Sequence, residues 1–551
     1  MGKTSSRTQR GVSRRALLRS GVASGIVVAA GGGAVVSAGA VGGSEPQDVP
    51  PGPLDERSVA ELQAWQGAGK ATARSLCESY LARIAALDGQ LRSIIEVNPD
   101  ALAIADRLDR ERKDKGPRGP LHGIPVVVKD NIATADRMET TAGSLALVGA
   151  RPKKDATVAA RLRSAGAVIL AKTNLSEWAN FRSSHSSSGW SGRGGQCRNP
   201  YALDRSPCGS SSGTAAAIAA SLAAVGVGTE TDGSIVCPSA HCSLVGIKPT
   251  LGAISRTGIV PIAHSQDTAG PMARTVADAA ALLGALVGED ARDAATAASA
   301  GKLSRDYTAF LDRGGLKGAR IGVARAKFFG YSPETDAVVE AALRVMAGLG
   351  AVLVDPADIP HAGEVDDDEL EVLLYEFKSD LNDYLADLGP GAAVHSLADV
   401  IAFNEAHRAQ ELPYFGQDLM IKAEGKGPLT EKAYLKALSR CRELSREKGL
   451  GALFAAHTLD AVVAPTGGPP WMIDLVTGDH FGGSSSTPAA VSGYPSVTLP
   501  AGYVFGLPVG VTLIGQPWSE PALIRMAFAL EQALAVRRPP RFLATADLTV
   551  R

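Results

Sequence analysis

The stretch from Ser206 to Thr250 carries two serine-bearing glycine turns on either side of one short apolar segment. The first turn reads Ser206-Pro-Cys-Gly-Ser-Ser-Ser-Gly213, and the second reads Gly228-Thr-Glu-Thr-Asp-Gly-Ser-Ile235. An alanine-rich run between them predicts a short helix. Glycine lets a backbone approach a ligand closely, and small hydroxyl residues beside glycine can present a nucleophile next to bare N–H groups. The pattern therefore predicts an acyl-transfer site.

Three other interpretations of the first turn compete with this one. A phosphate-binding loop needs lysine and then serine or threonine after its last glycine, whereas Gly213 is followed by Thr-Ala. A nucleophile elbow fits the spacing of Gly209 and Gly213, with Ser211 as the nucleophile, but an elbow follows a buried strand. Residues 199–207 contain two prolines and predict a loop instead. A flexible serine-glycine linker would not explain the second turn.

Strand and helix patterns alternate on the N-terminal side of this stretch. The run Pro-Val-Val-Val, which ends at Lys129, predicts a buried strand. A helix predicted over 155–165 and a strand over 167–171 follow, so the alternation favours the α/β class. Functional sites in α/β sheets form at strand ends, which makes Lys129 a candidate. The alternative is a lysine that extends to the surface and pairs with an acid.

Helical patterns cover most of the remaining chain. Over 75–87, apolar side chains recur on one helical face. Residues 364–449 are mostly helical in pattern, and a final helix is predicted over 520–535. The long segment 174–207 is too long for a simple connection and is typical of a site wall or lid.

Composition and charge narrow the function classes. The chain has 551 residues, of which 45% are hydrophobic and 21% charged, as in ordinary soluble enzymes. Its formal net charge is −1, but the first 40 residues hold six basic residues and no acid, so the rest carries −7. This balance gives no indication of a nucleic-acid partner.

The N-terminus has the pattern of an export signal. Ser13-Arg-Arg-Ala-Leu-Leu18 is a twin-arginine pattern, an uncharged stretch follows to Ala40, and Ala38-Gly-Ala40 is a small-x-small cleavage site. The weak hydrophobicity of the stretch argues against the alternative, a retained membrane anchor. We therefore predict a twin-arginine signal over 1–40 and a linker over 41–53. This predicts a bacterial protein that meets the membrane only during export and ends in the cell envelope or outside the cell.

The six cysteines are scattered, with no Cys-x-x-Cys pair and no cysteine-histidine zinc spacing. The sequence thus predicts no metal site, and most of the cysteines are expected to be buried thiols. Whether Cys237 pairs with its near neighbour Cys242 is left open.

Taken together, the motif ending in Lys129-Asp-Asn, the turn Gly209–Gly213 and the turn Gly228–Ile235 resemble the amidase signature family in content and order. The two turns place Ser210 and Ser234 24 positions apart, as in that family. The resemblance extends from about Leu54 to Arg541, and details such as 188–195 resemble its bacterial peptide amidase branch. It implies a single catalytic domain over 54–545, built on a large central mixed β-sheet with helices covering both faces.

The resemblance also assigns roles to residues. It implies that Ser234 is the nucleophile, that Ser210 is a bridging serine in a cis conformation, and that Lys129 is the base. The backbone N–H groups of the oxyanion hole would come from Thr231, Asp232, Gly233 and Ser234. The chain departs from the common family pattern at Ser212, Glu230, Asp232 and Val236. Of these, Asp232 is expected to place negative charge near the oxyanion.

The implied function is hydrolysis of carboxamide C–N bonds through an acyl-enzyme, with ammonia released from peptide C-terminal amides. Small aliphatic or aromatic amides are the alternative substrates. An amidotransferase component that delivers ammonia to tRNA-linked substrates is disfavoured by the leader and the acidic remainder. A serine esterase using Ser211 and a histidine, and a non-catalytic binding protein, are further alternatives. No metal or organic cofactor is implied, and the protein is expected to be a monomer or homodimer.

Overall fold

The computed structural model describes residues 52–549. The predicted export signal over 1–40, and the predicted linker up to residue 51, lie outside this range. Within it, no helix combines the length and the apolar character that crossing a membrane would require.

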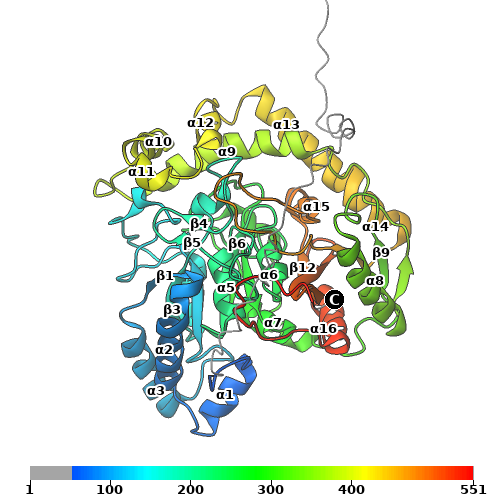
Figure 1. The fold of residues 1–551 in the computed structure, drawn as a ribbon, viewed down its shortest axis with the longest axis horizontal. Coiled ribbons are helices and arrows are strands. Elements are labelled where there is room, and N and C mark those ends of the chain that lie inside the picture. The colour runs from blue at the N-terminus through cyan, green and yellow to red at the C-terminus, as the bar shows by residue number, and fades with distance from the viewer. Residues whose placement is uncertain (1–51, 550–551) are drawn as a thin grey trace, which may run out of the picture. The chain divides into compact units, whose positions relative to one another are not determined.

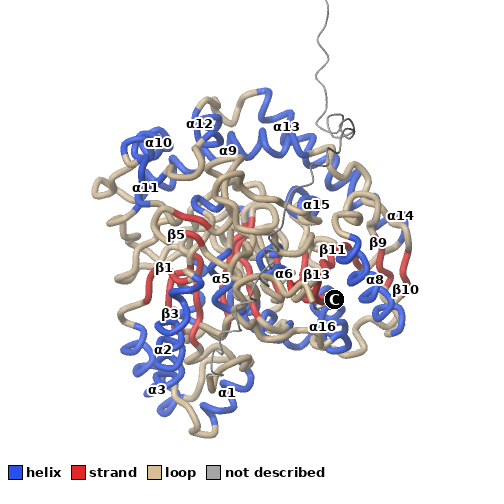
Figure 2. The backbone as a smooth tube through the Cα atoms, in the orientation of Figure 1, coloured by secondary structure: helices blue, strands red, loops and turns tan. Residues whose placement is uncertain are grey.

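One mixed sheet of eleven strands runs through the described chain (Figures 1 and 2). Its order is β1-β3-β2-β6-β8-β7-β12-β13-β11-β9-β10. The strands are β1 (Ile94–Val97), β2 (Pro125–Lys129), β3 (Val168–Thr173), β6 (Val225–Glu230), β7 (Val245–Lys248), β8 (Thr268–Ala273), β9 (Arg320–Val323), β10 (Val352–Val354), β11 (Ala461–Pro465), β12 (Ser496–Val504) and β13 (Leu507–Ile514). A separate hairpin pairs β4 (Trp190–Ser191) with β5 (Gly195–Gln196).

The strands near the predicted site run in both directions. β2 lies parallel to β3 on one side and to β6 on the other. β6 in turn pairs antiparallel with β8. Because β2 and β6 are parallel neighbours, their carboxyl ends meet at one edge of the sheet. Lys129 ends β2, and the second serine turn follows β6, so this pairing brings the lysine and the turn to the same edge.

Sixteen α-helices surround the sheet in the described range. They are α1 (Val59–Gly67), α2 (Ala73–Leu91), α3 (Ala101–Lys115), α4 (Thr157–Ser164), α5 (Ser212–Ala219), α6 (Val236–His241), α7 (Val276–Leu286), α8 (Pro333–Gly348), α9 (Asp366–Asp387), α10 (Leu397–Ala406), α11 (Arg408–Glu411), α12 (Asp418–Glu424), α13 (Lys432–Arg442), α14 (Gly451–His457), α15 (Thr487–Ser492) and α16 (Glu520–Leu534). Figure 1 shows α9–α13 gathered along the upper edge of the view. The helical patterns over 75–87, 364–449 and 520–535 are confirmed.

Helices cover both faces of the sheet, as β2 demonstrates. Successive side chains of a strand point to opposite faces. Val127 packs in a cluster with Ala215 and Ile218 of α5. Val126 and Val128 belong instead to the main core, with residues of α2, α4 and α7. The predicted fold, one α/β domain on a large mixed sheet between helices, is therefore confirmed.

Candidate active site

Lys129 is fully buried at the end of β2, with 0% of its surface exposed. Its Nζ donates hydrogen bonds to Ser210 Oγ at 2.7 Å, to Thr229 Oγ1 at 2.8 Å and to Thr229 O at 3.3 Å. In the part of the chain that the structure describes, Lys129 forms no ion pair. The alternative interpretation, a surface lysine paired with an acid, is therefore wrong. Lys129 lies at the end of the buried strand β2 and contacts the serine-glycine stretch instead.

Burial changes the acid-base chemistry of Lys129. Desolvation lowers its pKa from 10.5 to about 7, although the negative charges of Asp267 and Glu230 partly oppose this effect. A neutral amine has a lone pair that can take a proton from a hydroxyl group at hydrogen-bond distance. Lys129 is therefore suited to act as a base near neutral pH.

Ser210 follows a glycine that is closely packed against a neighbouring side chain. The Gly209–Ser210 peptide bond is cis, and Ser210 is fully buried. A Cβ atom on Gly209 would lie 2.1 Å from Ser176 Oγ. The backbone N–H of Ser176 also donates to Ser210 O at 3.1 Å. The segment after β3 thus packs directly against the turn and fixes its position.

Ser234 lies in the second turn, between β6 and α6, and is 7% exposed. The two turns touch through their backbones, since the N–H of Ser211 donates to Ser234 O at 3.2 Å. The structure thus brings together Lys129 and Ser210 by a side-chain hydrogen bond, and the turns of Ser210 and Ser234 by a backbone one.

The backbone amides predicted to form an oxyanion hole, those of residues 231–234, donate to no protein acceptor within residues 52–549. The next two amides are different: the carboxylate of Glu230 accepts hydrogen bonds from Ile235 N at 2.7 Å and Val236 N at 3.0 Å. Gly233 has a φ of +80°, a conformation that suits glycine. Glu230 therefore occupies the first amides of α6 and leaves those of the preceding turn available.

Asp232 directs its carboxylate toward α15. Ser486 Oγ donates to Asp232 Oδ1, and Thr487 Oγ1 donates to Oδ2 at 2.7 Å. Burial raises the pKa of Asp232, which disfavours its charged form. Two hydroxyl groups thus hold the carboxylate on the side of α15, and the backbone N–H of Asp232 donates to no protein acceptor within residues 52–549. The expected negative charge near the oxyanion stays a prediction.

Ser211, the nucleophile of the elbow interpretation, has a structural role. Its Oγ donates to Thr229 O at 3.1 Å and accepts from Thr229 N at 3.2 Å. No histidine within the described range is hydrogen-bonded to it, and a loop, not a strand, leads into α5. Ser211 joins the first turn to β6, so the esterase interpretation lacks both its strand and its histidine.

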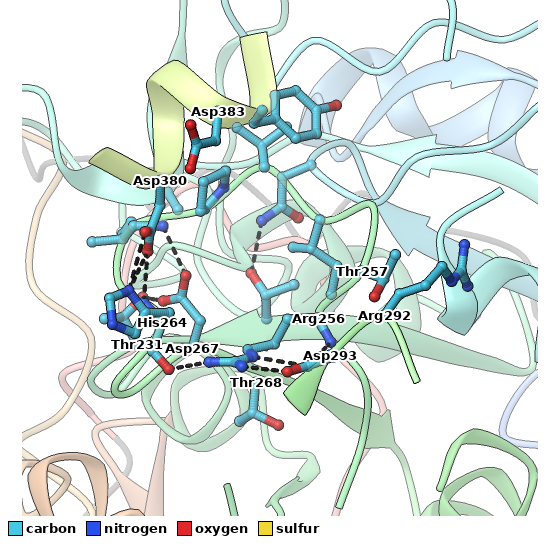
Figure 3. A pocket seen from close by; sticks show the side chains of 18 residues that line it. Thr231, Arg256, Thr257, His264, Asp267, Thr268, Arg292, Asp293, Asp380 and Asp383 are labelled. Atoms are coloured by element: carbon cyan, nitrogen blue, oxygen red, sulfur yellow. Dashed lines mark hydrogen bonds and ion pairs between the residues drawn. The ribbon is translucent and has the colours of Figure 1, made fainter. Parts of the chain in front are cut away.

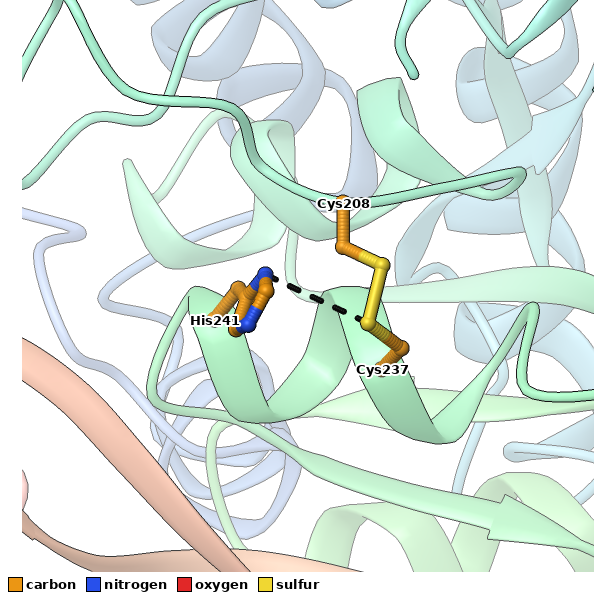
Figure 4. Close-up of side chains that lie close together, drawn as sticks. All are labelled: Cys208, Cys237 and His241. Atoms are coloured by element: carbon orange, nitrogen blue, oxygen red, sulfur yellow. Dashed lines mark hydrogen bonds between the residues drawn. A yellow bond between two sulfur atoms is a disulfide. The ribbon is translucent and has the colours of Figure 1, made fainter. Parts of the chain in front are cut away.

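A disulfide between Cys208 and Cys237 links the two serine turns (Figure 4). Cys208 lies two residues before Ser210, Cys237 lies three residues after Ser234, and their Cα atoms are 6.1 Å apart. Cys242, the near neighbour whose pairing with Cys237 the sequence left open, is a buried free thiol. Sequence analysis missed the pair that forms, although its two cysteines flank motifs that were expected to meet.

A cavity of about 340 Å³ lies beside Thr229 and the second turn, although Lys129, Ser210 and Ser234 are not among the residues that line it (Figure 3). Asn131, Thr229 and Thr231 line the side next to Lys129 and the second turn. The side chain of Asn131 donates to Thr229 Oγ1 at 3.0 Å. Neither Thr229, which contacts Lys129, nor Asn131 has a role that the sequence alone predicts. The one available signal was their position inside the two strongest motifs.

Two residue groups in the described range have the composition of a metal site. One consists of Cys208, Cys237 and His241, but its sulfur atoms form the disulfide. In the other, His264 Nδ1 lies 2.9 Å from Asp380 Oδ2, and His264 Nε2 lies 3.4 Å from Glu376 Oε1.

In that second group, the oxygens of Glu376 also accept hydrogen bonds from Ser265 N at 2.9 Å and the Tyr434 hydroxyl at 2.8 Å. Both groups are thus explained by bonds within the protein.

Comparison with known proteins identifies the family. The family model described as Amidase matches residues 75–524. A probable amidase of Arabidopsis thaliana is 41% identical over 500 residues, which is 89% of this chain and 92% of the relative. A glutamyl-tRNA(Gln) amidotransferase chain of Chloroflexus aurantiacus is 34% identical, over 87% of this chain and 97% of that protein.

Among solved structures, native peptide amidase from Stenotrophomonas maltophilia has 53% sequence identity and a TM-score of 0.86, over 89% of this chain and 100% of that one. A matched family over most of the chain, together with a solved relative of the same fold, settles the classification. The chain belongs to the amidase signature family and is an amidase, a hydrolase of carbon–nitrogen bonds.

Proposed function

We propose that this enzyme removes ammonia from the C-terminal amide of peptides through an acyl-enzyme on Ser234. Ser210 transfers protons, and Lys129 is the base. The observation that supports this most directly is the 2.7 Å hydrogen bond between Ser210 Oγ and the Nζ of a fully buried Lys129. A buried amine beside a buried hydroxyl can exchange a proton without competition from bulk water.

Lys129, Ser210 and Ser234 together account for every proton transfer in the reaction. Neutral Lys129 takes the proton of Ser210 while Ser210 takes that of Ser234, and Ser234 Oγ then attacks the amide carbonyl carbon. The N–H groups of residues 231–234 donate to the oxygen that becomes negative. The proton returns through Ser210 to the leaving nitrogen, ammonia departs, and water hydrolyses the ester by the same relay.

Two observations support a peptide as the acyl portion. The Stenotrophomonas enzyme, a peptide amidase by name, shares 53% of its residues with this chain. The cavity of about 340 Å³ beside Lys129 is also larger than a simple aliphatic amide needs. Small amides remain the alternative substrates.

The other candidate functions have less support. The Chloroflexus relative is by name part of an amidotransferase, but a tRNA partner is disfavoured by the charge of −7 outside the leader. A purely binding protein would not require a fully desolvated lysine next to Ser210, because burying an amine is unfavourable.

We also propose that the first 40 residues direct export by the twin-arginine route, so that the enzyme acts in the cell envelope or outside the cell. The twin-arginine pattern and the small-x-small site at 38–40 support this proposal. N-terminal sequencing of protein recovered from an exporting bacterial host tests it. A mature terminus near residue 41 is expected, and unprocessed protein retained in the cytoplasm would contradict it.

The test of the proposed function is ammonia release from an amidated dipeptide by residues 41–551. Ser234→Ala and Lys129→Ala are expected to remove release, while Ser211→Ala keeps a measurable rate because its hydroxyl only joins Thr229. A small amide assayed in parallel tests the peptide preference, which fails if the small amide has the higher kcat/KM. Release that survives Ser234→Ala would identify a different nucleophile.

A further inference from the structure

The cavity next to Lys129 has an acidic wall that the reaction itself does not require. Asp380 and Asp383 extend into its lining from α9, and Figure 3 shows both side chains on that helix above the cavity. Asp380 is bonded to His264 at the cavity edge. Asp383 is exposed and has no ion pair or hydrogen bond to any residue in the described range. Its negative charge is therefore free to act on a ligand.

The positive charges in the lining are already neutralised. Arg256 Nε donates to Asp293 Oδ2 at 2.9 Å. Arg292 Nε donates to Asp290 Oδ1 at 3.1 Å. Within residues 52–549, no arginine or lysine of the lining faces the cavity without an acid beside it. The free charge of the cavity is consequently negative.

The wall beside Lys129 also offers hydrogen-bond acceptors. Asn131 is only 2% exposed, and its Oδ1 has no hydrogen-bond partner among residues 52–549. The hydroxyl group of Tyr384, on α9, is buried and equally unpartnered in the described structure. Buried polar atoms without a partner are unfavourable and uncommon in native proteins. Both residues belong to the lining of the cavity, so its wall is polar as well as acidic.

We propose that this cavity binds a cationic group of the substrate, an ammonium or a guanidinium, and that the Asp383 carboxylate selects for it. Both cations carry several N–H donors and a positive charge, which matches the unpaired Asp383 carboxylate and the polar lining of the cavity. This inference rests on the proposed function and adds a preference to it.

Two parts of a peptide amide carry such a cation. One is a lysine or arginine side chain next to the amide, and the other is the free amino terminus of a short peptide. A cavity of about 340 Å³ has room for either, and the exposure of Asp383 places the charge at the entrance. Opposite charge at the entrance of a cleft raises the local concentration of a cationic substrate.

The test uses three dipeptide amides with residues 41–551. Acetyl-Ala-Arg amide carries a side-chain cation, acetyl-Ala-citrulline amide is its neutral isostere, and Ala-citrulline amide carries only a terminal ammonium. At low ionic strength, kcat/KM is expected to favour one cationic substrate over the neutral one by about fivefold, the magnitude of an exposed ion pair. The substrate that is preferred identifies the source of the cation. Salt at about 0.5 M is expected to reduce the ratio, since it screens charges.

Asp383→Asn is expected to reduce that ratio below about twofold. Asp367→Asn is the matched control, because it removes the same charge from the exposed start of α9, roughly 24 Å along the helix, and should leave the ratio unchanged. Thermal unfolding of both variants checks that each is folded. We expect their unfolding temperatures to match that of the parent enzyme, because both carboxylates are exposed.

Equal kcat/KM for the three substrates in the parent enzyme would overturn the inference, and a ratio unaffected by Asp383→Asn would overturn the role of Asp383. In either case, release of ammonia from the neutral substrate that depends on Ser234 would leave the proposed function intact. If the folded parent hydrolyses none of the three, the proposed function fails and this inference fails with it.

Discussion

Lys129 shows how one residue acquires its chemistry from its surroundings. In water a lysine is protonated at neutral pH, and in this protein burial among Ser210, Thr229 and the core lowers its pKa to about 7. Thr229 contributes both its hydroxyl and its carbonyl oxygen, so the amine has acceptors in its protonated form. Removing the lysine from water is therefore what makes it a candidate base.

The pH dependence of turnover follows from this pKa. Lys129 must be neutral to accept a proton, and its pKa is about 7. We expect kcat/KM to be constant above about pH 8 and to fall about tenfold for each pH unit below about 7, as the amine becomes protonated. Initial rates between about pH 5 and 9, with unfolding temperature measured at each pH, check this. A rate that stays constant down to the acid end of this range would exclude Lys129 as the base.

The variant Ser211→Ala tests whether Ser211 has a structural role or is the nucleophile. The Ser211 hydroxyl satisfies both the N–H and the carbonyl of Thr229 in the core. Its loss is expected to lower the free energy of unfolding by about 1–3 kcal/mol, because the buried N–H of Thr229 loses the hydroxyl as its acceptor and the carbonyl keeps only Lys129. Urea denaturation measures this. If instead stability is unchanged and acylation stops, Ser211 is the nucleophile after all.

At the scale of elements, the first serine turn is held by what lies around it. Gly209→Ala is expected to remove most activity, because the added Cβ would lie 2.1 Å from Ser176 Oγ and displace Ser210 from Lys129. Gly391→Ala is the control, since nothing lies within 4 Å of that position. Ammonia release and unfolding temperature measured for both variants test this. Full activity of Gly209→Ala would contradict the close packing at this turn.

The disulfide is the other element-scale constraint on the two turns. Replacing both Cys208 and Cys237 by serine is expected to lower the free energy of unfolding by about 2–4 kcal/mol, since the bond closes a loop across a separation of 29 residues. Dithiothreitol should lower the unfolding temperature of the parent protein and leave that of the double variant unchanged. An equal response of both proteins to the reductant would mean that the bond does not form in solution.

Across the whole molecule, buried ion pairs join segments that are far apart in the sequence. Arg182, 1% exposed in the segment after β3, has its Nη1 2.7 Å from Glu177 Oε1 and 3.7 Å from Glu411 Oε2 of α11. This contact connects the long segment 174–207 to the group of helices α9–α13, which carries the acidic wall of the cavity.

Arg182→Ala is therefore expected to lower the free energy of unfolding by about 3–5 kcal/mol, because the buried acids Glu177 and Glu411 would lose the cation beside them. Arg408→Ala is the matched control on α11. Its ion pair with Glu405 is largely exposed, with the arginine side chain 64% accessible, and it should matter little. Denaturant titrations of the two variants compare them, and equal losses would show that the buried pair has no special contribution.

The sequence by itself determined the fold class, the run of strands and helices near the site, and the three motifs of the family. These depend on local rules: β-branched residues fill buried strands, apolar residues recur at helical spacing, and glycine is required where a Cβ would collide. Local rules did not name the site residues: it was the resemblance of the three motifs to the amidase signature family that implied Lys129, Ser210 and Ser234, along with the amides of residues 231–234.

Only the tertiary structure decided which distant groups meet. It paired Cys237 with Cys208 and not with its near neighbour Cys242. It placed Thr229 against Lys129 and directed the carboxylate of Asp232 toward α15. It also placed α9 over the cavity, although this helix begins at Asp366, far along the chain from the second turn. The physical reason is that hydrogen bonds, burial and charge act through space, and a single sequence does not state which of its distant segments the packed core brings together.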